Sequence, residues 1–218
     1  MGREIGTTEY TRSQRTRYRR ELRRNLDLFE TFLDTAEFVD EGTVGVELEM
    51  NLAEQDSMAP ALIADTLLED LDEQYVHEIG RFNLEANLPV TRPDGTGLGE
   101  LETALGAAID RADEAARARG ARVVPVGHLP TISEDLFADE SWRAPGARYE
   151  ALESSVMEAR GEEITLRIEG EGRGVDTTFD SIAPESACTS MQLHLQVPPE
   201  QFAAAWNAAQ AIDRKSVV

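Results

Sequence analysis

Three stretches of the chain alternate between apolar and polar residues, which is the pattern of a half-buried β-strand. They cover residues 44–51, 82–88 and 191–197. Shorter apolar strands are predicted at 122–126 and 164–168. In each alternating stretch the apolar face is clean, and the polar face consists of acids, amides and one histidine. An ordinary solvated face would carry more Thr, Lys and Arg, so these polar faces indicate a function.

Helical periodicity separates these strands. Thr11 and Gln14 form a predicted capping box, and the apolar residues behind it recur every three or four positions, at Tyr18, Leu22, Leu26, Phe29, Leu33 and Ala36. We expect this first helix to end near Gly42. Further helices are predicted over 59–71, 98–120, within 143–161 and over 199–212. The interleaving predicts a mixed helix and strand protein.

Length and composition agree with a globular protein. The chain has 218 residues, 41% of them hydrophobic and 29% charged, and no apolar run approaches the length of a membrane-spanning helix. We expect a single domain over residues 1–218. No secretory signal is visible, so we expect a cytoplasmic protein without a membrane partner.

Charge is distributed unevenly. The net charge is −21. Residues 1–25 contain eight Arg and three acids, and residues 26–218 contain 13 basic and 39 acidic groups. Such an acidic body repels nucleic acid, so we expect no nucleic-acid partner. The Arg-rich face of the first helix (Arg15, Arg19, Arg23) favours a solvated surface over a binding surface.

The sequence gives little support for a disulfide, a zinc site or a phosphate-binding loop. A single cysteine, Cys188, excludes an intramolecular disulfide, and its small neighbours predict a buried, inert thiol. The three scattered histidines do not favour a zinc site. Residues 94–99 (DGTGLG) imitate a phosphate-binding loop, but they lack its Gly-Lys-Ser/Thr ending.

Paired carboxylates are the strongest chemical signal. Glu47 and Glu49 lie two residues apart on one strand face, and Glu85 lies on the similar face of the second strand. Carboxylate oxygens are preferred by Mg²⁺, so these residues are candidate metal ligands, and Glu78 is a weaker one. The alternative is that they simply face solvent in an acidic protein. Likewise, a strand histidine such as His194 is more often structural, and Arg148 more often lies on the surface.

Four segments together resemble the second bacterial and plant-like type of glutamate–cysteine ligase, in the glutamine-synthetase-like carboxylate–amine ligases. They are GVELE at 45–49, GRFNLEANLP at 80–89, RY at 148–149 and ACTSMQLH at 187–194. The first alone is a weak signal, but all four in this order are fairly specific. The resemblance covers about residues 11–214, which correspond to the N-terminal portion of the family's usual length.

The resemblance implies a fold and a set of site residues. The fold is α+β, with a mainly antiparallel curved sheet and helices packed on its outer face. Glu47, Glu49 and Glu85 are then catalytic residues and ligands of Mg²⁺ or Mn²⁺, together with Glu78. Arg148, Tyr149, Gln192 and His194 are substrate-binding residues.

The implied reaction uses ATP as co-substrate. ATP phosphorylates the side-chain carboxylate of glutamate, and the amine of cysteine attacks the acyl phosphate to give γ-glutamylcysteine. Two alternatives stay open: a ligase with another amine acceptor, and a non-catalytic metal- or ligand-binding module. Since much of the family's usual length has no counterpart here, we expect little activity, together with self-association or marginal packing of the chain.

Overall fold

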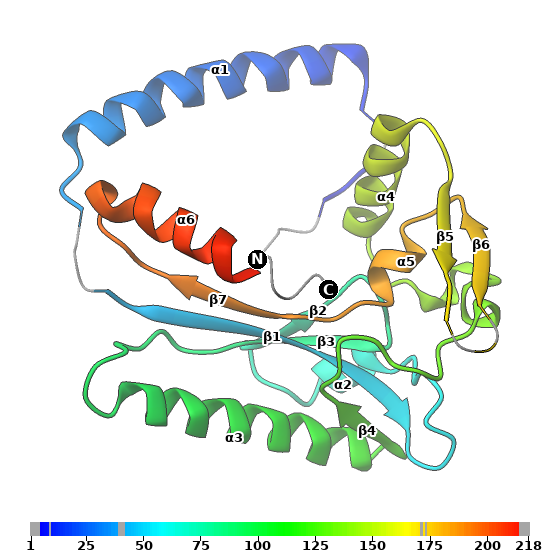
Figure 1. The fold of residues 1–218 in the computed structure, drawn as a ribbon. Helices are drawn as coiled ribbons and strands as arrows, with labels where there is room; N and C mark the ends of the chain where they lie inside the picture. Colours follow the sequence, from blue (N-terminus) through cyan, green and yellow to red (C-terminus); the bar gives the residue numbers. More distant parts are fainter. Residues whose placement is uncertain (1–4, 9, 39–41, 171, 173, 214–218) are drawn as a thin grey trace. The chain divides into compact units, whose positions relative to one another are not determined.

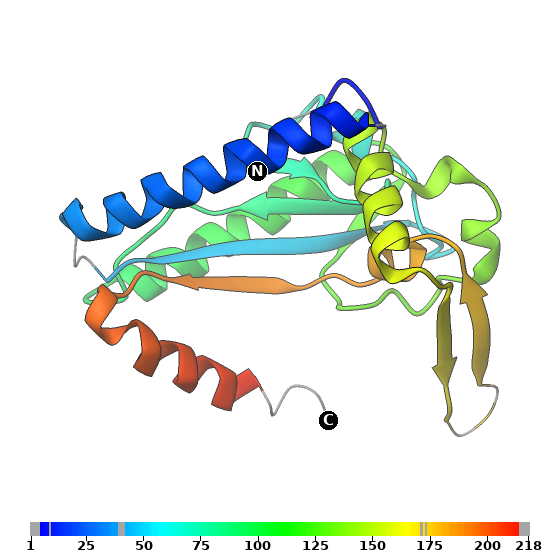
Figure 2. The same ribbon diagram turned by 90° about the horizontal axis from the view of Figure 1, so that it is seen from above.

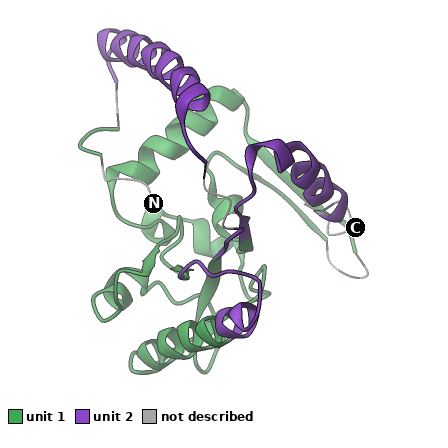
Figure 3. Ribbon diagram, turned by 90° about the vertical axis from the view of Figure 1, so that its left-hand side faces the viewer, with its two compact units in different colours: residues 1–9, 46–88, 103–192 green, residues 10–45, 89–102, 193–218 purple. Residues whose placement is uncertain are grey.

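The computed structural model describes residues 5–8, 10–38, 42–170, 172 and 174–213. The chain divides into two compact units (Figure 3). One contains residues 1–9, 46–88 and 103–192, and the other contains residues 10–45, 89–102 and 193–218. The architecture is α+β with an antiparallel sheet, which confirms the predicted class.

The main sheet is built around its longest strand, β1 (Val44–Glu54). The strand order is β2 (Tyr75–His77), β3 (Asn83–Asn87), β1 and β4 (Ala121–Val124), and β7 (Met191–Leu195) also pairs with β1. Figures 1 and 2 both show β7 beside β1. The pairs β1–β3, β1–β4 and β2–β3 are antiparallel.

Alternation along β1 and β3 matches the burial of their side chains. Val46, Leu48 and Met50 on β1 are buried, as are Leu84 and Ala86 on β3. The intervening glutamates are only partly buried. In α3 (Gly97–Arg117), Ala108, Ala112 and Ala116 recur every four residues and are all buried. The Tyr75 hydroxyl on β2 donates to the carbonyl oxygen of Ala108 at 2.9 Å.

A second apolar cluster forms where β3 begins. Phe82, Trp142, Ile182 and Ala183 are buried together, with Phe137 packed against them. Phe82 directly precedes β3. Phe137 and Trp142 end the 3₁₀ helices η1 (Glu134–Phe137) and η2 (Glu140–Trp142). Ala183 begins α5 (Ala183–Ser186), and Ile182 directly precedes it. The cluster thus joins four separate stretches of sequence.

The remaining elements are α4 (Ala147–Arg160) and a two-stranded hairpin of β5 (Ile164–Ile168) and β6 (Val175–Phe179). The chain continues through β7 into η3 (Pro199–Gln201) and α6 (Phe202–Asp213). Strand β6 was not predicted. No helix in the described part of the chain is long and apolar enough to cross a membrane.

The first helix, α1 (Arg12–Thr35), begins as predicted. The Thr11 side chain accepts a hydrogen bond from the Gln14 N–H, and the Gln14 side chain accepts one from the Thr11 N–H at 2.8 Å. The capping box is therefore confirmed. None of the helix's residues is buried.

Three expectations need correction. The helix predicted over 59–71 is only α2 (Ala64–Leu68), because Pro60 bridges to Ala53 and the Ala61 N–H donates to Leu52, which keeps this segment extended. Every residue of β7 is exposed, so its alternation does not mark a buried face. Cys188 is exposed rather than buried. Its neighbours Ala187 and Thr189 are buried instead. The thiol is still partly shielded from water, and this shielding, together with the charges of Glu185 and Glu49, raises its pKa. A raised pKa favours the unreactive protonated thiol.

Candidate metal centre

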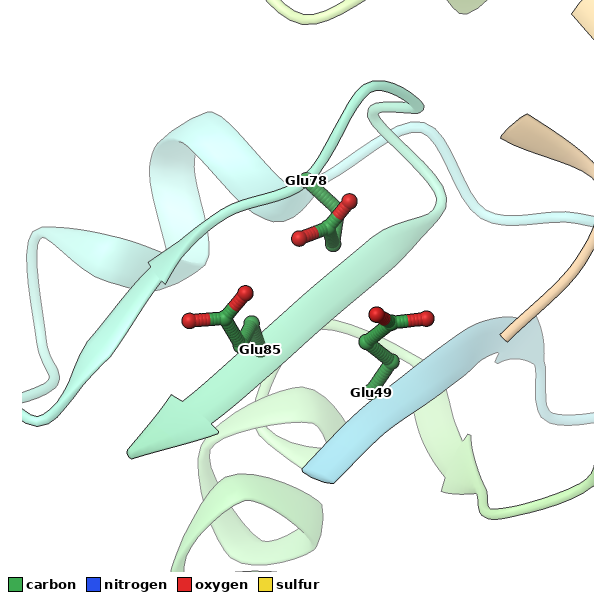
Figure 4. A group of neighbouring side chains, drawn as sticks. All are labelled: Glu49, Glu78 and Glu85. Carbon is green, nitrogen blue, oxygen red and sulfur yellow. The ribbon is translucent and has the colours of Figure 1, made fainter. Parts of the chain in front are cut away.

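Three glutamates from three segments meet on the polar side of the sheet. Glu49 on β1, Glu85 on β3 and Glu78, directly after β2, each place a carboxylate oxygen within 4.8 Å of the other two (Figure 4). Strand pairing explains the meeting. Glu49 and Glu85 are opposite each other in the β1–β3 register, and β2 ends beside β3, with His77 opposite Leu84. We call these three residues the carboxylate cluster.

Glu47 lies outside the carboxylate cluster. It shares the polar face of β1 but is paired with Asn87, two positions further along the strand. Two residues along a strand correspond to roughly 6.6 Å. The structure therefore groups Glu78 with Glu49 and Glu85, where the sequence had favoured Glu47. That any of these residues binds a metal stays a prediction.

Electrostatics within the carboxylate cluster favour a bound cation. Partial burial raises the pKa of Glu78 to about 8, and a hydrogen bond with Glu85 and the charges of Glu49 and Glu85 act in the same direction. The Ile79 N–H donates to the Glu78 carboxylate at 3.3 Å and opposes this shift. Three carboxylates this close repel one another, and a proton or a metal ion relieves that repulsion.

Neighbouring donors fix the carboxylates of Glu49 and Glu85. The Ser190 N–H donates to Glu49 Oε2 at 2.8 Å, and Gln192 Nε2 donates to Glu49 Oε1 at 3.4 Å. Asn87 Nδ2 donates to Glu85 Oε1 at 2.6 Å. Gln192, predicted as a substrate-binding residue, is thus brought to the carboxylate cluster.

A buried amide network holds the strands that carry these donors. Asn51 and Asn83 are fully buried, and Asn83 Nδ2 donates to Asn51 Oδ1 at 3.2 Å. Asn51 Nδ2 donates to the Val126 carbonyl at 2.7 Å and to Thr189 Oγ1 at 3.1 Å. The network ties Thr189, and so the adjacent Ser190, to β1. Its role was not foreseen, although the alternating polar positions 51 and 83 gave a signal for it.

The other predicted site residues are Tyr149, Arg148 and His194, and the described contacts of each differ. Tyr149 is buried, and its hydroxyl donates to the His77 carbonyl at 2.9 Å, which anchors the residue before Glu78. The guanidinium of Arg148 lies over the Tyr149 ring, 5.3 Å from its centre. His194 lies on β7, is exposed, and belongs to the other compact unit.

A model of glutamate–cysteine ligase family 2 matches residues 43–212. The chain belongs to this family. No curated protein and no solved structure matches it. The matched region begins just ahead of β1 and includes every element that carries the carboxylate cluster, whereas α1 precedes it.

Two arginines of the matched region form ion pairs within the chain. Arg81 Nε donates to Asp65 Oδ1 at 3.0 Å, and Arg81 Nη2 donates to Asp65 Oδ2 at 3.2 Å. Arg81 Nη1 donates to the Ser141 carbonyl oxygen. Arg143 forms ion pairs with Glu140 and Glu153. Both guanidinium groups are therefore already paired with carboxylates of this chain.

Proposed function

We propose that this chain provides the divalent-cation site of an ATP-dependent carboxylate–amine ligase that joins glutamate to the amine of cysteine. Family membership supports the reaction class. The observation that carries the proposal is the carboxylate cluster, in which three partly buried carboxyl groups converge from three segments.

The donor set fits Mg²⁺ or Mn²⁺. All three groups offer carboxylate oxygens, the ligand type that hard divalent cations prefer. Because the pKa of Glu78 is raised to about 8, one carboxyl keeps its proton near neutral pH unless a cation replaces it. When bound, such a metal neutralises charge on the phosphates of ATP and on the transferred phosphoryl group.

The chain's own residues would hold and orient this site. Ser190 and Gln192 fix the carboxylate of Glu49, and Asn87 fixes that of Glu85. Tyr149 anchors the strand that leads to Glu78. Pre-oriented ligands lower the cost of assembling the site.

Two chemical steps complete the proposed reaction. A side-chain oxygen of glutamate attacks the γ-phosphorus of ATP, ADP leaves, and γ-glutamyl phosphate forms. The cysteine nitrogen then attacks the acyl carbon, phosphate leaves, and the nitrogen loses a proton as the amide bond forms. Arg148 is the proposed contact for the acceptor, because its guanidinium lies on the ring of Tyr149 and is partly exposed. Glu47 and His194 remain proposed site residues, because each occupies a polar position of an alternating strand, β1 and β7 respectively.

A metal-binding module without catalysis is the second candidate. The ion pairs of Arg81 and Arg143 favour it, because they occupy cationic groups that phosphoryl transfer would use. A ligase with another amine acceptor has the same metal site and differs only in the amine it takes.

Metal binding can be tested directly with Mn²⁺, followed by electron paramagnetic resonance. We expect Glu49→Gln, Glu78→Gln and Glu85→Gln each to raise the Kd for Mn²⁺ by about tenfold or more. Glu150→Gln, an exposed change on α4, is the matched control and should bind like the wild type. Glu47→Gln separates the two ligand sets, since only a site that includes Glu47 would respond to it. Unchanged Mn²⁺ affinity in Glu85→Gln would overturn the site.

Turnover distinguishes the ligase from the binding module. We expect the 218-residue chain to release ADP with glutamate and cysteine at a rate well below about 1 s⁻¹, and Glu49→Gln to abolish it. Mn²⁺ binding without any glutamate-dependent ADP release would favour the binding module. Turnover with another amine in place of cysteine would identify a different acceptor.

A further inference from the structure

Helix α1 presents an apolar stripe that nothing in its own compact unit buries. Tyr18, Leu22, Leu26, Phe29 and Leu33 follow one another every three or four residues, and between 44 and 67% of each residue is exposed. The helix precedes the region that matches the family, residues 43–212. A stripe of this kind on a capped helix of 24 residues is typical of a helix that packs against another helix.

The charges beside the stripe change sign half-way along the helix. Arg19 and Arg23 lie on the same flank as Glu30 and Asp34, because the four residues are spaced four, seven and four apart. Like charges four residues apart destabilise an isolated helix. This arrangement of two Arg followed by two acids is therefore better explained by a partner helix whose charges run in the opposite order along the interface.

We propose that α1 pairs with α1 of a second copy of this chain, side by side and antiparallel. In that orientation Arg19 faces Asp34 of the other copy, and Arg23 faces Glu30. Both pairs are centred on the same point, between residues 26 and 27, as a two-fold axis requires. Leu26 then lies at the centre of the apolar seam. In a parallel pair this flank would instead meet the opposite flank of the other copy, so Arg19 and Arg23 would not face Glu30 and Asp34.

The charge order also selects this partner among others. Nucleic acid or an anionic membrane would attract the Arg-rich half but repel the half that carries Asp27, Glu30 and Asp34. A second copy satisfies both halves at once. The proposal is independent of the ligase function, since α1 carries none of the proposed metal ligands.

Sedimentation of the full 218-residue chain tests the seam. We expect a concentration-dependent dimer, and we expect Leu26→Asp to raise its dissociation constant by at least about tenfold, because the seam would bury a charge. Arg20→Ala on the opposite face of α1 is the control and should leave the dimer unchanged. Circular dichroism should show the same helix content in all three proteins. A wild-type monomer at all concentrations, with α1 packed on its own chain, would overturn the proposal.

Exchanging the charges tests the orientation. Reversing only Arg19 and Arg23 to Glu should weaken the dimer, since the four acids of one copy then face the four acids of the other. Reversing all four residues, with Glu30 and Asp34 changed to Arg, should restore it, because each pair is again of opposite charge. A fourfold variant that stays monomeric would contradict the antiparallel register.

Spin labels give an independent measure. With Cys188→Ser as background, labels at Asn25→Cys should lie close together across the dimer. Labels at Thr16→Cys should be separated by about 30 Å along the helix axes, given 1.5 Å per residue. Short distances at both positions would show a parallel pair and overturn the model.

Discussion

Glu78 keeps its proton because of where the strands place it. Partial burial disfavours its anion, and the carboxyls of Glu85 and Glu49 disfavour it further, so the pKa rises from 4.5 to about 8. The unfolded chain has neither constraint. Between pH 4.5 and 8 the unfolded state therefore releases a proton that the folded state retains, and folding stability falls as the pH rises through this window.

Replacing this carboxyl should remove that pH dependence. We expect Glu78→Gln to become progressively more stable than the wild type between pH 5 and 8, because the glutamine is neutral in both states. Chemical denaturation at the two pH values measures the effect. Added Mg²⁺ should stabilise the wild type at pH 8 more than it stabilises the variant.

An exposed carboxyl provides the control for this comparison. Glu150→Gln on α4 should change stability by the same small amount at both pH values. If Glu78→Gln also shifted stability equally at pH 5 and 8, the raised pKa would be refuted.

At the scale of single elements, the sequence predicted those features that depend on interactions between residues close together in the chain. The capping box at Thr11 and Gln14 forms as expected. The alternation over 44–51 gives a strand whose apolar residues are buried. The helix predicted over 98–120 forms as α3, Gly97–Arg117. Each of these results depends on residues within a few positions of one another.

Other features depend on contacts across the chain, which no local pattern contains. Glu78 joins the carboxylate cluster through the pairing of β2 with β3, and its sequence neighbours do not indicate this. The segment before α2 stays extended because Pro60 meets Ala53 on β1. Alternation showed that Glu47 and Glu49 share a face, but it did not show which of them lies opposite Glu85.

The start of α3 depends on a glycine for steric reasons. A Cβ on Gly97 would overlap the carbonyl oxygen of Arg92, whereas a Cβ on Gly106 would meet nothing within 4 Å. We expect Gly97→Ala to destabilise the chain by about 1–3 kcal/mol, since the backbone must move. Gly106→Ala, exposed in the interior of the same helix, should stabilise it by about 0.5–1 kcal/mol.

Thermal unfolding of both variants measures this difference. The two substitutions add the same methyl group to the same helix, at its crowded first residue and at an open position in its interior. An equal effect of both would show that residues 92–97 adapt without cost.

At the scale of the whole molecule, large apolar side chains of β7 and α6 are exposed. Met191, Leu193 and Leu195 on β7 are more than half exposed, as are Phe202 and Trp206 on α6. In the described sheet β7 pairs with β1. A strand with an unpaired outer edge and exposed apolar side chains can pair with another chain.

We therefore expect association through β7, separate from the pairing of α1. Leu193→Lys should reduce light scattering at high concentration and the fluorescence of a bound hydrophobic dye, because a charge on an edge strand opposes pairing. Its thermal midpoint should stay close to that of the wild type, since Leu193 is 60% exposed. Using Leu26→Asp as the background removes the α1 seam from the measurement.

A matched change shows whether the position or merely the added charge is responsible. Ile168→Lys places the same side chain on a different strand, at a residue of β5 that is 53% exposed, and should leave association unchanged. If Leu193→Lys and Ile168→Lys acted alike, net charge would explain the result. If the Leu26→Asp chain were already a monodisperse monomer with a cooperative thermal transition, β7 would need no partner. The 218 residues would then form a self-contained unit, and the binding module would become the better explanation of the carboxylate cluster.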